Sequence, residues 1–286
     1  MTKHANTLAG IVELHVHSSP DVRIRRMNDL ELMESGVQNS VRAIVIKSHV
    51  APTAGRAAIV NLLREEKYPD SPFTMYGGVT LNQNVGGINP AAVDACLKIG
   101  GKIVWLPTFH SESHMRKEGK EGGVRCVENG RIVAPLQEVF KLVAANDAVL
   151  ATGHLAPEEI FIVVEAARNA GVAKILVNHP ESNLVGMSDE EQARLIRDFD
   201  VFIERCYAQP VGGGKYKSNL PANCELFKRL GAKNFVVATD AGQVENPPWN
   251  EELAEYIGYL LDHGLSRDDV DTLTKKNPAM LLGLAN

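Results

Sequence analysis

Two histidines close a short apolar run near the start of the chain, where residues 12–21 read VELHVHSSPD. Side chains alternate along a β-strand, so residues two positions apart point to the same face. His15 and His17 are therefore expected to present two imidazoles side by side. Two neutral imidazoles and a carboxylate suit a borderline divalent cation such as Zn²⁺. The pair alone is weak evidence, because unrelated polar residues often end a strand.

Further histidines end later apolar runs of the chain. Such ends carry His49, His110, His154 and His179, whereas His4, His114 and His263 lie elsewhere. Polar residues are common at strand ends, but this does not explain a preference for imidazole. We therefore predict a site for one or two divalent cations, with zinc favoured over manganese or iron. Its ligands are expected to be His15, His17, His49, His154, His179 and Asp240.

Eight apolar, β-branched runs alternate with longer amphipathic stretches. Near-continuous apolar runs predict strands buried on both faces, as in parallel sheets. The runs are residues 10–17, 41–49, 73–82, 102–110, 148–155, 173–180, 200–208 and 234–242. Eight strand–helix units in this length predict a single (β/α)8 TIM barrel, regular or distorted, over residues 1–286. A doubly wound open sheet is the alternative.

In such a barrel the active site forms at the C-terminal ends of the strands, where the histidines fall. Residues 111–134 follow the fourth run and are charged and rich in glycine. We expect a long irregular loop there, either a lid over the barrel mouth or a solvated insertion. After the seventh run, Gly212–Gly214 lacks the strand and helix that flank a phosphate-binding loop, and a mobile loop is expected.

Composition narrows the classes of partner. The net charge of -5 and 6% aromatic residues argue against a nucleic-acid surface. None of the four cysteines forms a C-x-x-C pair, and the N-terminus has no apolar signal segment. We expect a cytoplasmic protein with no membrane span, which acts on a small molecule. A homo-oligomer is compatible with the sequence.

Polar residues near the expected barrel mouth are candidates for binding the substrate. Basic residues after the first strand could clamp a carboxylate or a phosphate, although solvated loop residues are the simpler explanation for any one of them. The third and fourth strand ends add uncharged polar groups. The candidates are Arg23, Arg25, Asn82, Thr108 and His110.

This ordered set of residues resembles the amidohydrolase superfamily of metal-dependent hydrolases. The matching residues are His15 and His17, then His154, His179 and Asp240, and the ending KKNPAMLLGL at residues 275–284 is also similar. The resemblance implies that His15, His17 and Asp240 bind metal. It also implies that His154 and His179 bind a second metal or polarise the substrate. An uncharacterised branch of the superfamily is suggested.

The chain departs from the superfamily pattern on the fourth strand. Binuclear members usually carry a bridging carboxylated Lys or a Glu there, but KIVWLPTFHS offers neither at its end. The second strand instead places Lys47 and His49 on one face. A His ligand on that strand resembles the polymerase and histidinol phosphatase family. Lys47 is open to three roles: a bridging carbamate, an ammonium that binds substrate, or a partner of Asp240 or Glu204.

The expected reaction is hydrolysis of an amide, cyclic amide, ester or lactone bond in a small, anionic substrate. Asp240 would move the proton of a metal-activated water, and His179 would stabilise the oxyanion, with Lys47 as a further catalytic candidate. Three alternatives stay open: a phosphoesterase of the histidinol-phosphatase type, a metal-dependent decarboxylase, and a non-catalytic barrel that binds a metal or metabolite.

Overall fold

A computed structural model describes residues 7–212 and 215–284. His4, Gly213 and Gly214 lie outside the described residues, so the mobile loop predicted at Gly212–Gly214 stays untested there. Each of the eight apolar runs contains strand structure, and these strands pair in parallel. They are β1 Val12–His17, β2 Ala43–Lys47, β3 Thr74–Tyr76, β4 Gly78–Thr80, β5 Ile103–Trp105, β8 Val149–Ala151, β9 Lys174–Val177, β10 Phe202–Cys206 and β13 Phe235–Ala238.

The strands belong to two sheets, with orders β1-β2-β3 and β13-β10-β9-β8-β5-β4. The third apolar run is divided into β3 and β4 at Gly77. A Cβ atom at Gly77 would lie 2.5 Å from the carbonyl carbon of Thr53, so the backbone approaches there too closely for another residue. A parallel bridge between Val16 and Ala241 joins the far edges. The mixed α/β fold and strand order are confirmed, but the described strands do not form one continuous closed sheet.

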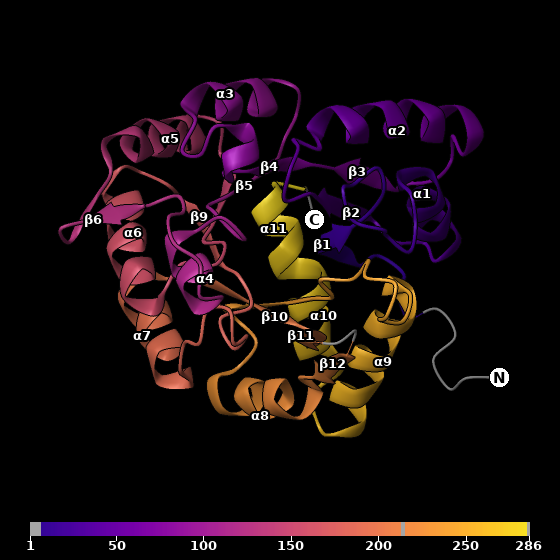
Figure 1. The fold of residues 1–286 in the computed structure, drawn as a ribbon. Helices are drawn as coiled ribbons and strands as arrows, with labels where there is room; N and C mark the ends of the chain where they lie inside the picture. Colours follow the sequence, from indigo (N-terminus) through magenta and orange to yellow (C-terminus); the bar gives the residue numbers. More distant parts are fainter. Residues whose placement is uncertain (1–6, 213–214, 285–286) are drawn as a thin grey trace.

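Helices surround the strands on the outside of the molecule (Figure 1). Among the described residues, no helix is long and apolar enough to cross a membrane. The helices that follow the strands are α1 Asp29–Gln38, α2 Ala54–Lys67, α3 Pro90–Lys98, α5 Ala134–Ala145, α6 Pro157–Asn169, α7 Asp189–Phe199, α8 Leu220–Leu230 and α9 Trp249–Asp262. A 3-10 turn, η1 Gln83–Val85, follows β4, and α10 Arg267–Asp271, the π-helical turn η2 Thr272–Lys276 and α11 Asn277–Leu282 end the chain.

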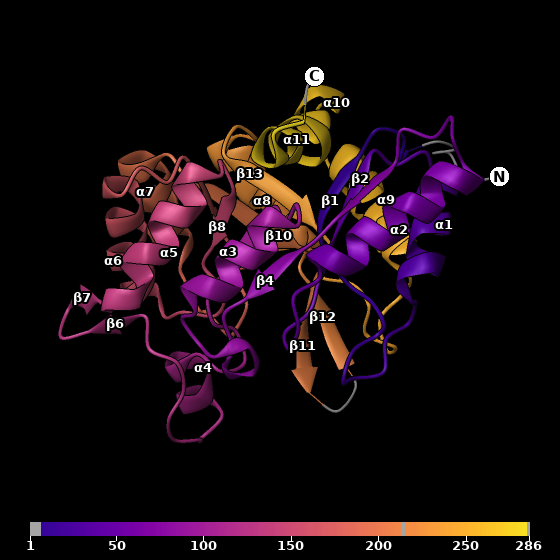
Figure 2. The same cartoon turned by 90° about the horizontal axis from the view of Figure 1, so that it is seen from above.

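Two apolar clusters hold these layers together. The larger one lies between strands and helices, and the smaller one gathers side chains from the strands around Trp105. Burying each large apolar side chain contributes roughly 1.5–3 kcal/mol. Ala279, Leu281 and Leu282 of α11 belong to the smaller cluster. Because α10 and α11 lie on the side opposite α4 (Figure 2), they close one end of the strand assembly and leave the other end for the site.

The prediction of a wholly irregular segment at residues 111–134 is wrong. The segment contains α4 Glu112–Lys117 and an antiparallel pair, β6 Val127–Glu128 and β7 Arg131–Ile132. The Ser111 side chain accepts a hydrogen bond from the amide of His114 and so caps α4. Asn129 and Gly130 both have positive φ, as the tightest hairpin turns require. The Asn-Gly pair was the overlooked signal.

A second hairpin follows β10, formed by β11 Ala208–Gly212 and β12 Lys215–Ser218. This hairpin and α4 both project on the side where the strands end (Figure 2). Helix α4 and the β11–β12 hairpin therefore flank the site. Whether the α4 segment acts as a lid stays a prediction.

Candidate metal centre

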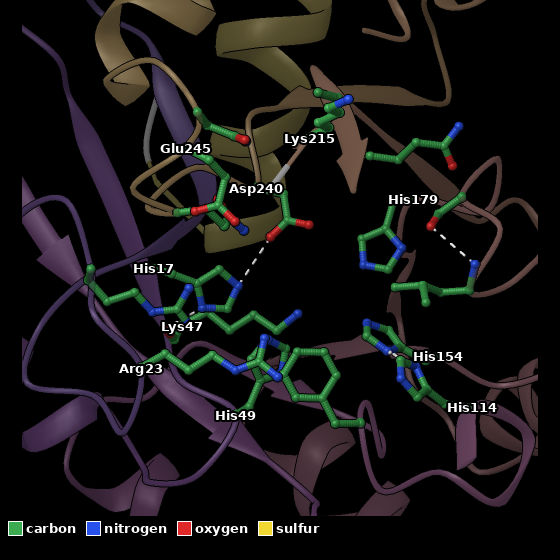
Figure 3. A pocket seen from close by; sticks show the side chains of 18 of the residues that line it. His17, Arg23, Lys47, His49, His114, His154, His179, Lys215, Asp240 and Glu245 are labelled. Carbon is green, nitrogen blue, oxygen red and sulfur yellow. Dashed lines mark hydrogen bonds and ion pairs between the residues drawn. The ribbon is translucent and has the colours of Figure 1, made fainter. Parts of the chain in front are cut away.

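The C-terminal ends of the strands surround a pocket of about 390 Å³. Figure 3 shows His17, Lys47 and Asp240 on one side of it, and His154 and His179 on the other. These side chains come from β1, β2 and the ends of β8, β9 and β13. The structure therefore brings together the histidines predicted as metal ligands, but not His110.

His15 and His17 converge on one oxygen atom of Asp240. The Nε2 atoms of His15 and His17 lie 3.0 and 3.1 Å from Oδ1 of Asp240. The strand's alternation produces this convergence, as predicted, although β1 carries an irregularity between Glu13 and Val16. Both imidazoles are buried, whereas the Asp240 side chain keeps 22% exposure. This carboxylate is thus the member of the trio that reaches solvent in the pocket.

The opposite ring nitrogens are held by oxygen acceptors. Nδ1 of His15 lies 3.1 Å from Oε2 of Glu204, and Nδ1 of His17 lies 3.0 Å from the carbonyl oxygen of Lys47. An acceptor at Nδ1 holds a proton there, so Nε2 is the nitrogen of each ring that can offer a lone pair to a cation in place of a proton. Metal-binding histidines are oriented in this way by partners outside the ligand set. Glu204 in turn accepts a hydrogen bond of 2.8 Å from Asn178.

The local backbone explains how Asp240 reaches the histidines. β13 ends at Ala238, and Asp240 has a φ of 56°, a conformation that Asp tolerates better than most residues. At Gly242 a Cβ atom would lie 2.0 Å from the carbonyl oxygen of His17, so only glycine fits against β1. The amide of Thr239 donates to the buried Glu13 carboxylate. The segment after β13 is therefore fastened to β1.

Electrostatics at this centre favour a positive charge. Burial opposes protonation of His15, but the carboxylates of Asp240 and Glu204 outweigh it and raise the pKa of His15 to about 9. Burial and the Arg25 guanidinium lower the pKa of His17 to about 3. Burial favours the neutral acid at Glu204, yet His15 lowers its pKa to about 2. The anionic carboxylates of Asp240 and Glu204 thus lie on either side of the buried His15 imidazole. Their negative charge favours a cation at the Nε2 side of that ring.

Lys47 is almost fully buried within the same group. Its Nζ lies 3.0 Å from Nε2 of His15 and 5.4 Å from the centre of the Trp105 ring. Burial lowers the pKa of Lys47, with Asp240 and Glu204 acting against the shift. A buried amine needs such partners because unpaired charge is costly away from water. The hydrogen-bond partner of Lys47 is His15, whereas the sequence suggested Asp240 or Glu204, and the chemical role of Lys47 stays a prediction.

His49 lies in a continuous stack that runs from the rim to the centre. The guanidinium of Arg23 lies 4.3 Å from the Phe109 ring centre, Phe109 lies 3.9 Å from His49, and His49 lies 4.7 Å from His17. The Thr108 hydroxyl contacts Nδ1 of His49 at 2.8 Å. Burial lowers the pKa of His49 well below its usual value. His49 is thus held as a neutral ring beside His17.

His154 and His179 form the facing wall, with ring centres 5.1 Å apart. Burial lowers the pKa of both, for His179 to about 4. Nδ1 of His179 is buried and has no hydrogen-bond partner among the described residues. A buried polar atom without a partner is costly and marks a position for a ligand or substrate atom. His179 therefore suits either predicted role.

Two important neighbours escaped the sequence analysis. The expectation that His114 lies away from the site is wrong. His114 lines the pocket, and its Nδ1 lies 2.9 Å from Nδ1 of His154. Glu204 was considered only as a partner of Lys47, but it contacts His15. The one available signal for His114 is Glu118 four residues later, which is the spacing of a contact along a helix.

The substrate-binding candidates divide into two groups. Arg23 and Arg25 line the pocket; Arg25 is buried and ion-paired with Asp21 at 2.9 Å, whereas the Arg23 guanidinium has no carboxylate partner among the described residues. Asn82 and Thr108 are buried and hydrogen-bonded to each other at 2.7 Å. They support His49 from behind.

His110 does not line the main pocket. It lines a neighbouring cavity of about 390 Å³ that shares Arg23 and His49 with the main pocket.

The donor set fits a divalent cation. Ligand atoms lie within 4.8 Å of one another in two groups: His15, Cys206 and Asp240, and His15, His179 and Glu204. The first group includes the thiol of Cys206, and burial raises its pKa well above its usual value. His17 joins through the shared Asp240 oxygen. Imidazole with carboxylate is the chemistry that zinc and similar ions prefer.

Residues 10–204 match a family described as a "Family of unknown function (DUF6282)". No curated protein matches the chain in sequence. Solved structures share the fold at low identity. An amidohydrolase from Pseudomonas aeruginosa is 13% identical with a TM-score of 0.68, covering 98% of both chains.

Two further solved structures cover almost the whole chain. A 2,6-dihydroxybenzoate decarboxylase complexed with 2,6-dihydroxybenzoate is 11% identical with a TM-score of 0.56, over 96% of this chain and 100% of that one. An amidohydrolase from Burkholderia multivorans with bound zinc is 10% identical with a TM-score of 0.58, over 97% and 100%. At these identities the likeness establishes the fold.

Proposed function

Because this chain belongs to the DUF6282 family of unknown function, we propose its activity from the site itself: it is a metal-dependent hydrolase of the amidohydrolase superfamily. The observation that carries the proposal is the convergence of two buried Nε2 atoms on Asp240 Oδ1, at 3.0 and 3.1 Å. The fold it shares with amidohydrolases, one of them with bound zinc, supports it.

One or two divalent cations, with zinc favoured, would be held by His15, His17 and Asp240, with His49, His154 and His179 as further ligands. A bound divalent cation lowers the pKa of a water molecule towards ~7 and polarises a carbonyl oxygen. Because Nδ1 of His15 and of His17 is held by Glu204 and by the Lys47 carbonyl, Nε2 of each ring is the atom that would bind the cation beside Asp240.

Asp240 is the proposed general base. His15 and the other neighbours hold its pKa well below the usual value although burial favours the neutral acid, so it is an anion at neutral pH. Its exposure of 22% lets it contact a water molecule in the pocket. It would accept the proton of that water and deliver it to the leaving group. His179 and Lys47 would stabilise the negative charge that develops on the substrate oxygen.

The substrate is proposed to be a small anionic amide, cyclic amide, ester or lactone. The free guanidinium of Arg23 and the buried Arg25 lie at the pocket, and Lys215 lies across it (Figure 3). Arg25 is already oriented by Asp21, so it needs little reorganisation to bind a carboxylate. These cations would hold the acidic group while the bond to be cleaved faces Asp240.

Decarboxylation is the second candidate activity. β5 ends in the buried Trp105, and it carries no Lys or Glu that could bridge two metal ions. A single-ion site would be compatible with decarboxylation, and two structures that share this fold are 2,6-dihydroxybenzoate decarboxylases. Release of CO₂ from aromatic acids would distinguish this activity from hydrolysis.

The proposal is tested by metal analysis and substrate screening of the purified protein. We expect one or two equivalents of bound zinc, manganese or iron, and hydrolysis of a lactone, ester or amide that chelators abolish and metal restores. Phosphate monoesters and aromatic carboxylic acids should be included in the screen. Protein that binds no divalent cation after chelation and reconstitution would contradict the proposal.

A further inference from the structure

The segment after β5 places a second imidazole directly against His154. Nδ1 of His114 lies 2.9 Å from Nδ1 of His154, and the two buried rings stack with centres 5.0 Å apart and planes 21° apart. Figure 3 shows both rings at the same wall of the pocket. At this distance one of the two nitrogens must carry a proton and the other a lone pair.

The contact made by Nε2 of His114 indicates which of the two Nδ1 atoms carries the proton. Oε1 of Glu118 lies 3.2 Å from Nε2 of His114 as an ion-pair contact, outside hydrogen-bond geometry, and the other Glu118 oxygen is 2.7 Å from Lys120 Nζ. A carboxylate at this distance electrostatically favours the proton on Nε2 of His114, and a neutral ring then has its lone pair on Nδ1. His154 must donate from Nδ1. The lone pair of His154 is therefore on Nε2.

The α4 segment also contacts the backbone of His154. The hydroxyls of Ser111 and Ser113 donate to the carbonyl oxygen of His154 at 3.0 and 3.4 Å. Lys117 at the end of α4 donates to three carbonyls of the loop after β9, the shortest being Val185 at 2.7 Å. Thus α4 is held in one place relative to the ring that it contacts.

We infer that His114 is a positioning residue which, backed by Glu118, fixes the tautomer of His154 so that Nε2 faces a divalent cation as a lone-pair donor. The inference rests on the proposed function, because it takes His154 as a metal ligand. It assigns the α4 segment a part in the metal centre, in addition to the predicted role as a lid.

Two variants separate hydrogen bonding from packing. His114→Phe keeps an aromatic ring beside Phe109 and His154 but removes the acceptor. His114→Gln restores an acceptor in place of the ring. Partners of metal-binding histidines typically contribute about 10- to 100-fold to metal affinity. We therefore expect Co²⁺ affinity to fall by about that factor in His114→Phe and to recover in part in His114→Gln.

The readouts are Co²⁺ titration followed by visible absorption, and long-range ¹H–¹⁵N NMR of the histidines in metal-free protein. The spectrum of the wild type should report Nδ1–H for His154, and His114→Phe should lose that fixed tautomer. Lys141→Ala is the control, because Lys141 is an exposed residue of α5 whose ion-pair contact is with Glu138. Its Co²⁺ affinity should match that of the wild type.

Three results would overturn the inference: an Nε2–H tautomer of His154 in the wild type, wild-type Co²⁺ affinity in His114→Phe, or an equal loss in Lys141→Ala. A wild type that binds no Co²⁺ or Zn²⁺ would instead contradict the proposed function. The NMR measurement needs no metal, so the two failures are distinguishable.

Discussion

Nδ1 of His15 lies 3.1 Å from Oε2 of Glu204, and neither side chain has any exposed surface. The contact orients the imidazole that meets both Asp240 and Lys47 through its other nitrogen. It also joins β1 to β10, two strands that are not neighbours in either sheet. The buried carboxylate therefore links the assembly of the strands to the orientation of a predicted ligand.

Replacing that carboxylate should weaken metal binding. In Glu204→Gln the amide keeps the size of the side chain but loses the charge that favours a cation at His15, so we expect zinc affinity to fall roughly 10- to 100-fold. Competition with a chromophoric chelator measures it. Glu165→Gln, an exposed residue of α6, is the matched control. Unchanged affinity in Glu204→Gln would show that Glu204 does not orient the ligand.

Asp240→Asn should separate metal binding from catalysis. The amide oxygen can still face His15 and His17, but it cannot accept a proton from water, and general-base contributions are typically ~10²–10⁴-fold. We expect kcat on the best substrate to fall by about that factor while metal content falls less. Asp70→Asn, an exposed change of the same kind, should match the wild type. Full activity in Asp240→Asn would rule out the proton-transfer role.

Glu252 should make the protein less stable as the pH rises. Burial, with help from Asp240, raises its pKa from 4.5 to about 9 in the folded protein. Below pH 4.5 both folded and unfolded states are neutral at this residue. Between pH 4.5 and 9 only the unfolded state ionises, so the stability contributed by the protonated acid is progressively lost.

Glu252→Gln removes this dependence, so its melting temperature should exceed that of the wild type by a margin that grows from pH 5 to about 9 and then levels off. Scanning calorimetry across this range measures the margin. Glu251→Gln, on the adjacent exposed residue, should show no such trend. A margin that is constant with pH would contradict the assignment.

Arg56 should hold the loop that carries Arg23 and Arg25. Its guanidinium contacts both oxygens of Asp29 at 2.7 Å and donates to the carbonyls of Pro20 and Ser18. Removing one partner of a mostly buried ion pair is strongly destabilising, so Arg56→Ala should cost roughly 3 kcal/mol in the free energy of unfolding. Denaturant titration measures it.

The control for Arg56→Ala is an exposed ion pair. Lys67→Ala breaks the contact between Lys67 and Glu34, and it should destabilise the protein far less than Arg56→Ala does, because water screens an exposed ion pair. An equal cost for the two variants would mean that Arg56 contributes nothing beyond a surface pair.

Periodicity and residue type predicted much of this protein. The apolar runs located every parallel strand, because strands buried on both faces require such runs. The strand-end rule predicted that His15, His17 and Asp240 lie together, since the C-terminal ends of parallel strands lie on one side of the sheet. The division of the third run at Gly77 was not predictable, because it depends on how closely Thr53 approaches.

Other features depended on contacts between distant segments. His114 looked like one more polar residue in a charged loop, and only the packing of α4 brings it to 2.9 Å from His154. Glu204 shows its role only once β10 faces β1. Local sequence determines which side chains can do chemistry and which strand carries them. The tertiary structure alone decides which nitrogen of each imidazole faces the pocket, because that choice depends on an acceptor contributed from elsewhere in the chain.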